Sequence, residues 1–103
     1  MKEVTNDQVI KQQIQTSSNL LVLDFYATWC GPCKMLTPKL NELETRYPNV
    51  EFYKIDVDVL ESFSQECKIS AMPTLLFVKN GEVVQRIEGA NLPVIMNTLQ
   101  QYA

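Results

Sequence analysis

The residues best suited to chemistry are two cysteines, Cys30 and Cys33, with Gly31 and Pro32 between them. An apolar run precedes the pair and a helical pattern follows it, so the pair lies where a strand passes into a helix. Unpaired N–H groups and the helix dipole at a helix N-terminus stabilise a thiolate, and Lys34 adds positive charge nearby. The spacing also allows a small-loop disulfide that Pro32 restricts. These features predict thiol–disulfide redox chemistry.

Half of a zinc or iron–sulfur site is the alternative interpretation of this pair. Such a site needs further ligands, but Cys67 is the only other cysteine and the chain contains no histidine. The lack of histidine also excludes Ser-His and Cys-His nucleophile pairs and any imidazole base. An odd number of cysteines argues against a secreted disulfide framework. Redox chemistry without an imidazole is therefore the favoured interpretation.

Asp24 is the most informative residue outside the cysteine pair, because it lies inside the apolar run 20–26. A carboxylate is costly to bury in its charged form, so its pKa should be raised by desolvation. Two interpretations are open at this point. Either backbone groups or water satisfy the carboxylate and it has no chemical task, or it is one of the perturbed groups that cluster at functional sites.

The elements that position these residues follow from the hydrophobic spacing. Thr5 and Gln8 have the capping-box pattern of a helix start, and the polar residues 17–19 end that helix. The run 20–26 lacks polar alternation and predicts a central parallel strand buried on both faces. The residues expected on the inward face of the first helix are Val9, Ile10 and Ile14.

A second helix is predicted after Cys33; it should end before Pro48 and be kinked by Pro38. A strand over 50–57 follows, and then a short helix whose apolar stripe includes Cys67. Leu36, Leu40, Leu43 and Tyr47 should form the inward face of the second helix.

Two further strands are predicted over 74–78 and 83–87, joined through Asn80-Gly81, which is a strong hairpin signal. Asn91 should cap a last helix with Pro93 in its first turn. Strands alternating with helices and then a hairpin indicate an α/β protein with a mixed sheet covered on both faces. The spacing alone predicts four strands.

Six consecutive residues, Trp29 to Lys34, and several distant ones occur at spacings shared with a known family. The distant ones are Asp24-Phe25, Met72-Pro73-Thr74, Gly81 and Gly89-Ala90. With these residues the chain resembles the thioredoxin family over nearly its whole length, and Met72 and residues 56–58 resemble eukaryotic-type members. Protein disulfide isomerases typically carry His in place of Pro32, and glutaredoxins typically carry Pro-Tyr between the cysteines.

The resemblance implies a thioredoxin fold over residues 1–103 as a single domain, with a central mixed five-stranded sheet flanked by four helices. It implies that Cys30, as an exposed thiol, attacks a target disulfide and that Cys33, shielded in the helix, resolves the mixed disulfide. Asp24 would then be the buried base that deprotonates Cys33. Lys54 matches a family lysine that modulates this carboxylate, and an ordinary exposed lysine is the equal alternative.

A proline that begins a strand, such as Pro73, is normally preceded by a trans peptide bond. The resemblance instead implies a cis proline packed against the active-site disulfide, whose preceding backbone pairs with an extended substrate segment. The residue types leave two further questions open. Trp29 is either a docking residue or a core aromatic, and Cys67 is either a core residue or a regulatory thiol. The implied docking surface consists of Trp29, Gly31, Pro32, Met72, Pro73, Gly89 and Ala90.

The activity implied is the reduction of disulfides in protein substrates, with a thioredoxin reductase restoring the dithiol from NADPH or ferredoxin. The alternatives are a redox-switched binding module that regulates a partner protein, and a disulfide isomerase-like oxidoreductase. We expect no cofactor, because no Gly-rich nucleotide-binding sequence is present. We expect no metal and a monomeric chain.

The net charge and the distribution of apolar residues limit the partners and the cellular location that we expect. A formal net charge of −3 argues against nucleic acid as a partner. No apolar run is long enough to span a membrane. The polar, acidic start Met1–Asp7 is not a targeting segment, so we expect a cytoplasmic protein. A mature form that has lost such a segment is the alternative, and Met1 argues against it.

Overall fold

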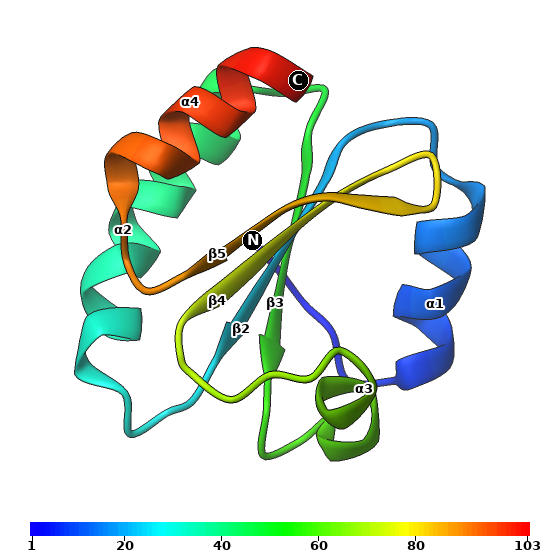
Figure 1. Ribbon diagram of the computed structural model, residues 1–103, viewed down its shortest axis with the longest axis vertical. Coiled ribbons are helices and arrows are strands. Elements are labelled where there is room, and N and C mark those ends of the chain that lie inside the picture. Colours follow the sequence, from blue (N-terminus) through cyan, green and yellow to red (C-terminus); the bar gives the residue numbers. More distant parts are fainter.

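Five strands form one mixed sheet in the order β1-β3-β2-β4-β5, and the computed structural model describes all residues, 1–103 (Figure 1). β3 pairs in parallel with β1 and β2, whereas β4 is antiparallel to β2 and β5. This confirms the mixed five-stranded sheet. The strands are β1 Lys2–Glu3, β2 Leu21–Tyr26, β3 Glu51–Asp56, β4 Thr74–Lys79 and β5 Glu82–Glu88.

Four helices cover the sheet, with α2 and α4 on one face and α1 and α3 on the other (Figure 1). No helix is both long enough and apolar enough to cross a membrane. The helices are α1 Asp7–Thr16, α2 Gly31–Arg46, α3 Glu61–Glu66 and α4 Leu92–Tyr102.

β2 is buried on both faces, as predicted, and its side chains alternate between two apolar clusters. Val22 belongs to the cluster under α2 and α4, whereas Leu23 and Phe25 belong to the cluster under α1 and α3. Side chains two residues apart on a strand point to the same face, so Asp24 lies with Val22 on the α2 side of the sheet. This alternation is what brings a carboxylate beneath the helix that carries the cysteines.

The N-terminal region departs from the prediction in two ways. Asn6, not Thr5, caps α1, because its extended backbone lets its side chain accept a hydrogen bond from the Gln8 N–H at 2.8 Å. Val9 is 59% exposed rather than inward, since Ile10 and Ile14 form the face that packs on the sheet. The two-residue strand β1 was not predicted from spacing because it is too short to show any alternation.

The later elements follow the prediction closely. β3 is one residue shorter than predicted at each end, and α2 runs through Pro38 without interruption. Asn80 and Gly81 join β4 to β5 with φ values of +52° and +80°, which confirms the tight hairpin. The side chain of Asn91 accepts a hydrogen bond from the Val94 N–H at 3.3 Å, which confirms the cap of α4.

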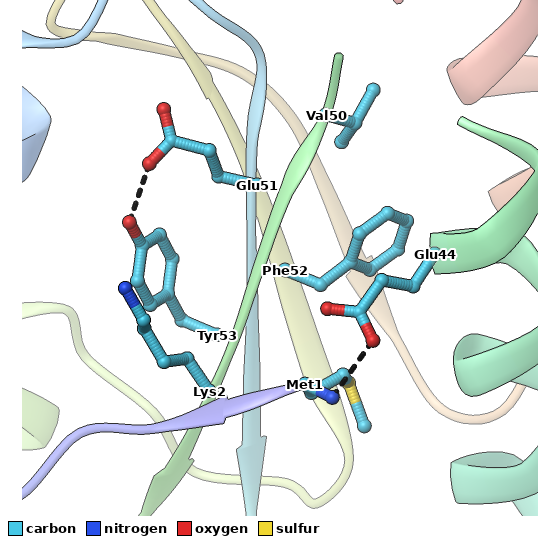
Figure 2. Close-up of a pocket in the computed structure, with 7 residues that line it drawn as sticks. All are labelled: Met1, Lys2, Glu44, Val50, Glu51, Phe52 and Tyr53. Atoms are coloured by element: carbon cyan, nitrogen blue, oxygen red, sulfur yellow. Dashed lines mark hydrogen bonds and ion pairs between the residues drawn. The ribbon is translucent and has the colours of Figure 1, made fainter. Parts of the chain in front are cut away.

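Glu51 ties the end of α1 to the start of β3. Its carboxylate accepts hydrogen bonds from Gln13 Nε2 at 2.7 Å, Ser17 Oγ at 2.6 Å and Asn19 Nδ2 at 3.1 Å. It also accepts one from the Tyr53 hydroxyl, which Figure 2 shows. Burial acts to raise the pKa of Glu51, but the hydrogen bonds to its charged form outweigh burial and lower the pKa. The cluster therefore stabilises the fold while Glu51 is ionised.

Replacing Glu51 by Gln should lower the free energy of unfolding at pH 7 by about 1–3 kcal/mol, because four hydrogen-bond donors, most of them partly buried, lose a charged acceptor. The stabilisation is present above the unfolded pKa and is lost as the pH falls through the lowered folded pKa. Urea unfolding from pH 3 to pH 7 measures both effects. Glu42→Gln, an exposed change on α2, is the matched control. Equal stability of the two variants at pH 7 would contradict the role of the cluster.

Candidate active site

Cys30 and Cys33 are joined by a disulfide at the N-terminus of α2, with their Cα atoms 5.4 Å apart. Cys30 is the N-cap residue, and its Sγ accepts a hydrogen bond from the Cys33 backbone N–H at 3.2 Å. The same N–H and the helix dipole would face a thiolate at Cys30 once the disulfide is reduced. The predicted placement of the pair at a strand-to-helix junction is therefore confirmed.

Both cysteines are shielded, which corrects the expectation that Cys30 is exposed. Cys30 is 6% exposed and Cys33 is 2% exposed. Together with Ala27 they form a small apolar cluster, against which Met72 and Val57 pack. Cys30 remains the more accessible of the two residues, but it does not protrude from the surface around it.

A cavity of about 300 Å³ lies beside the disulfide and joins Cys33 to Asp24. Lys54 lines the same cavity, because it is paired in register with Asp24 on the neighbouring strand β3. The cavity is large enough for water molecules, and Asp24, Lys54 and Thr37 supply polar groups to its lining. The structure thus brings three residues that lie far apart in the sequence, Asp24, Cys33 and Lys54, to the lining of one cavity.

The carboxyl group of Asp24 is 2% exposed, and its Oδ1 has no hydrogen-bond partner. Burial raises its pKa from 3.8 to about 7; the charge of Lys54 lowers this pKa, and that of Glu3 raises it. The raised pKa predicted from the sequence is confirmed. Lys54 acts on Asp24 through space, since its Nζ lies 3.6 Å from Glu3 Oε1 and 5.2 Å from the centre of the Tyr26 ring.

The segment before β4 lies against the disulfide. The Met72–Pro73 peptide bond is cis, as the family resemblance implied, and the Met72 carbonyl oxygen lies 3.6 Å from Cys30 Sγ. The Gly89 N–H donates a hydrogen bond to the Pro73 carbonyl at 2.8 Å. This bond holds the end of β5, and with it Ala90, next to the cis proline.

Trp29 is 67% exposed, so it is not a core aromatic. Its Nε1 donates a hydrogen bond to Asp58 Oδ2 at 3.1 Å, which holds the ring at the surface beside the cysteines. Gly31, Pro32 and Ala90 are also exposed. All the residues expected to dock a substrate therefore lie around the disulfide.

A family model described as Thioredoxin matches residues 1–101. The chain belongs to the thioredoxin family. It is 50% identical over 80 residues to thioredoxin-1 of Saccharomyces cerevisiae, which is 78% of each chain. It is 40% identical over 100 residues to thioredoxin H5 of Arabidopsis thaliana, covering 97% of this chain and 83% of that protein.

Solved thioredoxin structures have the same fold. The thioredoxin of Fasciola hepatica superposes with a TM-score of 0.93 at 36% identity and full coverage of both chains. Oxidised mitochondrial thioredoxin 3 of S. cerevisiae gives 0.92 at 40% identity, with 98% of this chain and 94% of that chain covered. With its Cys30–Cys33 disulfide, the chain is accordingly a thiol–disulfide oxidoreductase that reduces protein disulfides and is recharged by a thioredoxin reductase.

Two residues of this thioredoxin site were not identified from the sequence. Asp58 follows β3, and its place at the carboxyl end of a strand parallel to β2 is a signal that could have pointed to the site. Glu3 contributes to the pKa of Asp24 and accepts a hydrogen bond from the Tyr26 hydroxyl at 2.8 Å. Nothing in the local sequence indicates this role, because it depends on the pairing of β1 with β3.

Cys67 lies away from the thioredoxin disulfide and packs, half-buried, against the cluster under α1 and α3. Burial raises its pKa and Glu66 raises it further, whereas Arg86 and Lys11 act to lower it. A raised thiol pKa means less thiolate at neutral pH, so its surroundings favour the core interpretation over a reactive thiol.

The largest cavity, about 400 Å³, is not at the disulfide. It opens beside β1 and β3 and includes the ion pair between the Met1 amino group and Glu44 at 2.9 Å (Figure 2). It contains no thiol. Nowhere in the chain do three His, Cys, Asp or Glu side chains come together in a way that could hold a metal ion.

Replacing Asp24 by Asn should raise the free energy of unfolding at pH 7 by about 2–4 kcal/mol, since the folded chain no longer has to ionise a buried group. The raised pKa means that the folded wild type binds the proton more tightly. Wild-type stability should therefore fall as the pH rises from about 4 to about 7, whereas Asp24→Asn should lack this fall. Denaturant unfolding across this range measures it. Equal or lower stability of the variant at pH 7 would overturn the assignment.

Proposed function

We propose that Cys30 is the attacking thiol and Cys33 the resolving thiol of this oxidoreductase. The observation that carries the proposal is the Cys33 N–H directed at Cys30 Sγ at the helix N-terminus. The Cys30 thiolate attacks one sulfur of the target disulfide, and the other target sulfur leaves as a thiolate. Cys33 then attacks Cys30 Sγ, the second target thiolate leaves, and the chain ends with the Cys30–Cys33 disulfide.

Asp24 is proposed as the base for the second step. Its pKa of about 7 lets it hold or release a proton near neutral pH, and its cavity extends to Cys33. It accepts the Cys33 proton, directly or through water, as Cys33 becomes the nucleophile. Lys54 is proposed as a modulator, because its charge holds the pKa of Asp24 below the value that burial alone would set. Lys54 would therefore affect the proton transfer and not the reaction between the sulfur atoms.

Around the disulfide we propose a substrate-docking surface. The Met72 carbonyl beside Cys30 Sγ is placed to accept a hydrogen bond from an extended substrate backbone, which would add to the chain like a strand. Trp29, Gly31 and Pro32, all exposed, give the surface an apolar character that suits many partners. The surface comprises Trp29, Gly31, Pro32, Met72, Pro73, Gly89 and Ala90.

The proposed setting is the cytoplasm, with the chain acting as a monomeric, single-domain electron carrier over residues 1–103. A reducing compartment keeps a free thiol such as Cys67 reduced. Proteins with reducible disulfides are the substrates. One similar yeast structure, with a TM-score of 0.92 at 39% identity, concerns thiol resolving in a 1-Cys peroxiredoxin via glutathione and thioredoxin systems. Peroxidases with thiol chemistry are therefore proposed among the targets.

Replacing Cys33 by Ser should trap substrates as mixed disulfides on Cys30, because the second attack is lost. Non-reducing gels of the variant mixed with an oxidised protein substrate should show a stable adduct that dithiothreitol releases. Asp24→Asn should form the same adduct only transiently, with resolution slowed on the order of 10²-fold, a usual contribution of a general base.

Cys30→Ser is the matched control for the trap. This variant keeps Cys33 but lacks the attacking thiol, so it should form no mixed disulfide at the active site. Turnover by Cys33→Ser without any adduct on the gel would show that the two roles are assigned wrongly. An adduct on Cys30→Ser that matches that on Cys33→Ser would do the same.

Reduction of insulin in the presence of NADPH and a thioredoxin reductase tests the function as a whole. The chain should accelerate the precipitation of the insulin B chain over reductase alone, and the double variant Cys30→Ser, Cys33→Ser should not. No acceleration by the wild type would overturn the proposed function. Full biological activity of the double variant would favour the binding-module alternative.

A further inference from the structure

An apolar groove of about 240 Å³ opens next to Pro32, between the first turns of α2 and the start of α4. Met35, on one wall, is 79% exposed, the highest value among the exposed large apolar side chains of this chain. Lys39 is the only charged residue of the groove. The lining residues are Pro32, Met35, Leu36, Lys39, Ala90 and Leu92.

The groove continues the docking surface rather than standing apart from it. Pro32 lies between the two cysteines, and Ala90 follows Gly89, whose N–H is bonded to the Pro73 carbonyl. Both Pro32 and Ala90 belong to the docking surface and to the groove. An extended substrate segment advances about 3.3 Å per residue. Because Pro32 adjoins both cysteines and also lines the groove, we expect a side chain close to the reacting cysteine of a substrate to enter the groove.

The charge of the groove indicates what fits there. Lys34 and Lys39 are the only charged residues from 31 to 41, so this half of α2 is cationic in a chain of net charge −3. Lys39 takes part in none of the ion pairs of the chain. Glu88, the acidic residue that precedes Gly89-Ala90, is paired with Arg86 at 3.1 Å. Lys39 is therefore free to pair with a carboxylate on a partner.

We propose that this groove is a specificity subsite, in which an aliphatic side chain of the disulfide-bearing substrate packs between Met35 and Leu92 while a neighbouring carboxylate pairs with Lys39. The proposal rests on the proposed function, since it extends the same docking surface. It predicts that the chain prefers reducible cysteines flanked by an aliphatic and an acidic residue.

Symmetric disulfide dimers of short peptides test this preference. The sequences Asp-Leu-Gly-Cys-Gly-Leu-Asp and Lys-Leu-Gly-Cys-Gly-Leu-Lys carry the same flanks on both sides, so substrate direction does not matter. Asp-Ser-Gly-Cys-Gly-Ser-Asp removes the aliphatic part. Each reduced chain converts one peptide disulfide into two thiols and becomes oxidised itself. The rate constant is followed in a single turnover by the fluorescence of Trp29, the only tryptophan.

The readout is the ratio of rate constants between peptides, compared across variants, so that intrinsic peptide reactivity cancels. Lys39→Glu should shift the Asp-to-Lys peptide ratio about five- to tenfold toward the Lys peptide, the size of an exposed ion pair turned into a repulsion. Arg46→Glu makes the same charge change on the last turn of α2 and should leave the ratio within about twofold of wild type. Met35→Ser should lower the Leu-to-Ser peptide ratio about threefold.

Three results would overturn the subsite: an unchanged Asp-to-Lys ratio in Lys39→Glu, an equal shift in Arg46→Glu, or an unchanged Leu-to-Ser ratio in Met35→Ser. The exposed positions of Met35 and Lys39 keep these variants folded, which thermal melting checks. Bis(2-hydroxyethyl) disulfide, too small to fill the groove, should react at the same rate with the wild type and with Arg46→Glu. Failure of the wild type to reduce even this compound would instead contradict the proposed function.

Discussion

The hydrogen bond from the Cys33 N–H to Cys30 Sγ is the interaction on which the site depends. It exists because α2 begins at Gly31 and leaves its first N–H groups without partners in the helix. The helix is held in that position by Leu36, Leu40 and Leu43, which are packed into the core under α2 and α4. A rigid helix end thus presents a donor and a dipole to one sulfur, while the rest of the chain supplies only the surroundings of that sulfur.

Asp24 shows a conflict between stability and chemistry. The inward alternation of β2 forces its carboxyl group into the core, where Oδ1 has no partner and ionisation is opposed by burial. Lys54 compensates only in part, because its Nζ lies close to Glu3 and the ring of Tyr26. The result is a carboxyl group with a pKa of about 7 in the cavity that Cys33 also lines, which is why we propose it as the base for that thiol. A chain without histidine obtains this property only by accepting a less stable core.

Elements with a strong local pattern were predicted well, and those set by pairing were not. The hairpin at Asn80-Gly81 and the cap at Asn91 depend on residues a few positions apart, and both are confirmed. β1 is two residues long and exists only because β3 offers it an edge. α1 is capped by Asn6 and not by Thr5, although both residue types can cap a helix, because Asn6 has the extended backbone that directs its side chain to the Gln8 N–H.

By itself the sequence determined the redox chemistry, since two cysteines at this spacing before a helix, without further metal ligands, admit little else. It also determined that a carboxylate lies in a buried strand. Only the tertiary structure decided that Cys30 is shielded, that Asp24 and Lys54 are paired in register beside Cys33, and that Pro32 and Ala90 share one groove. The physical reason is range: capping and spacing act over a few residues, whereas burial and electrostatics depend on contacts between distant segments.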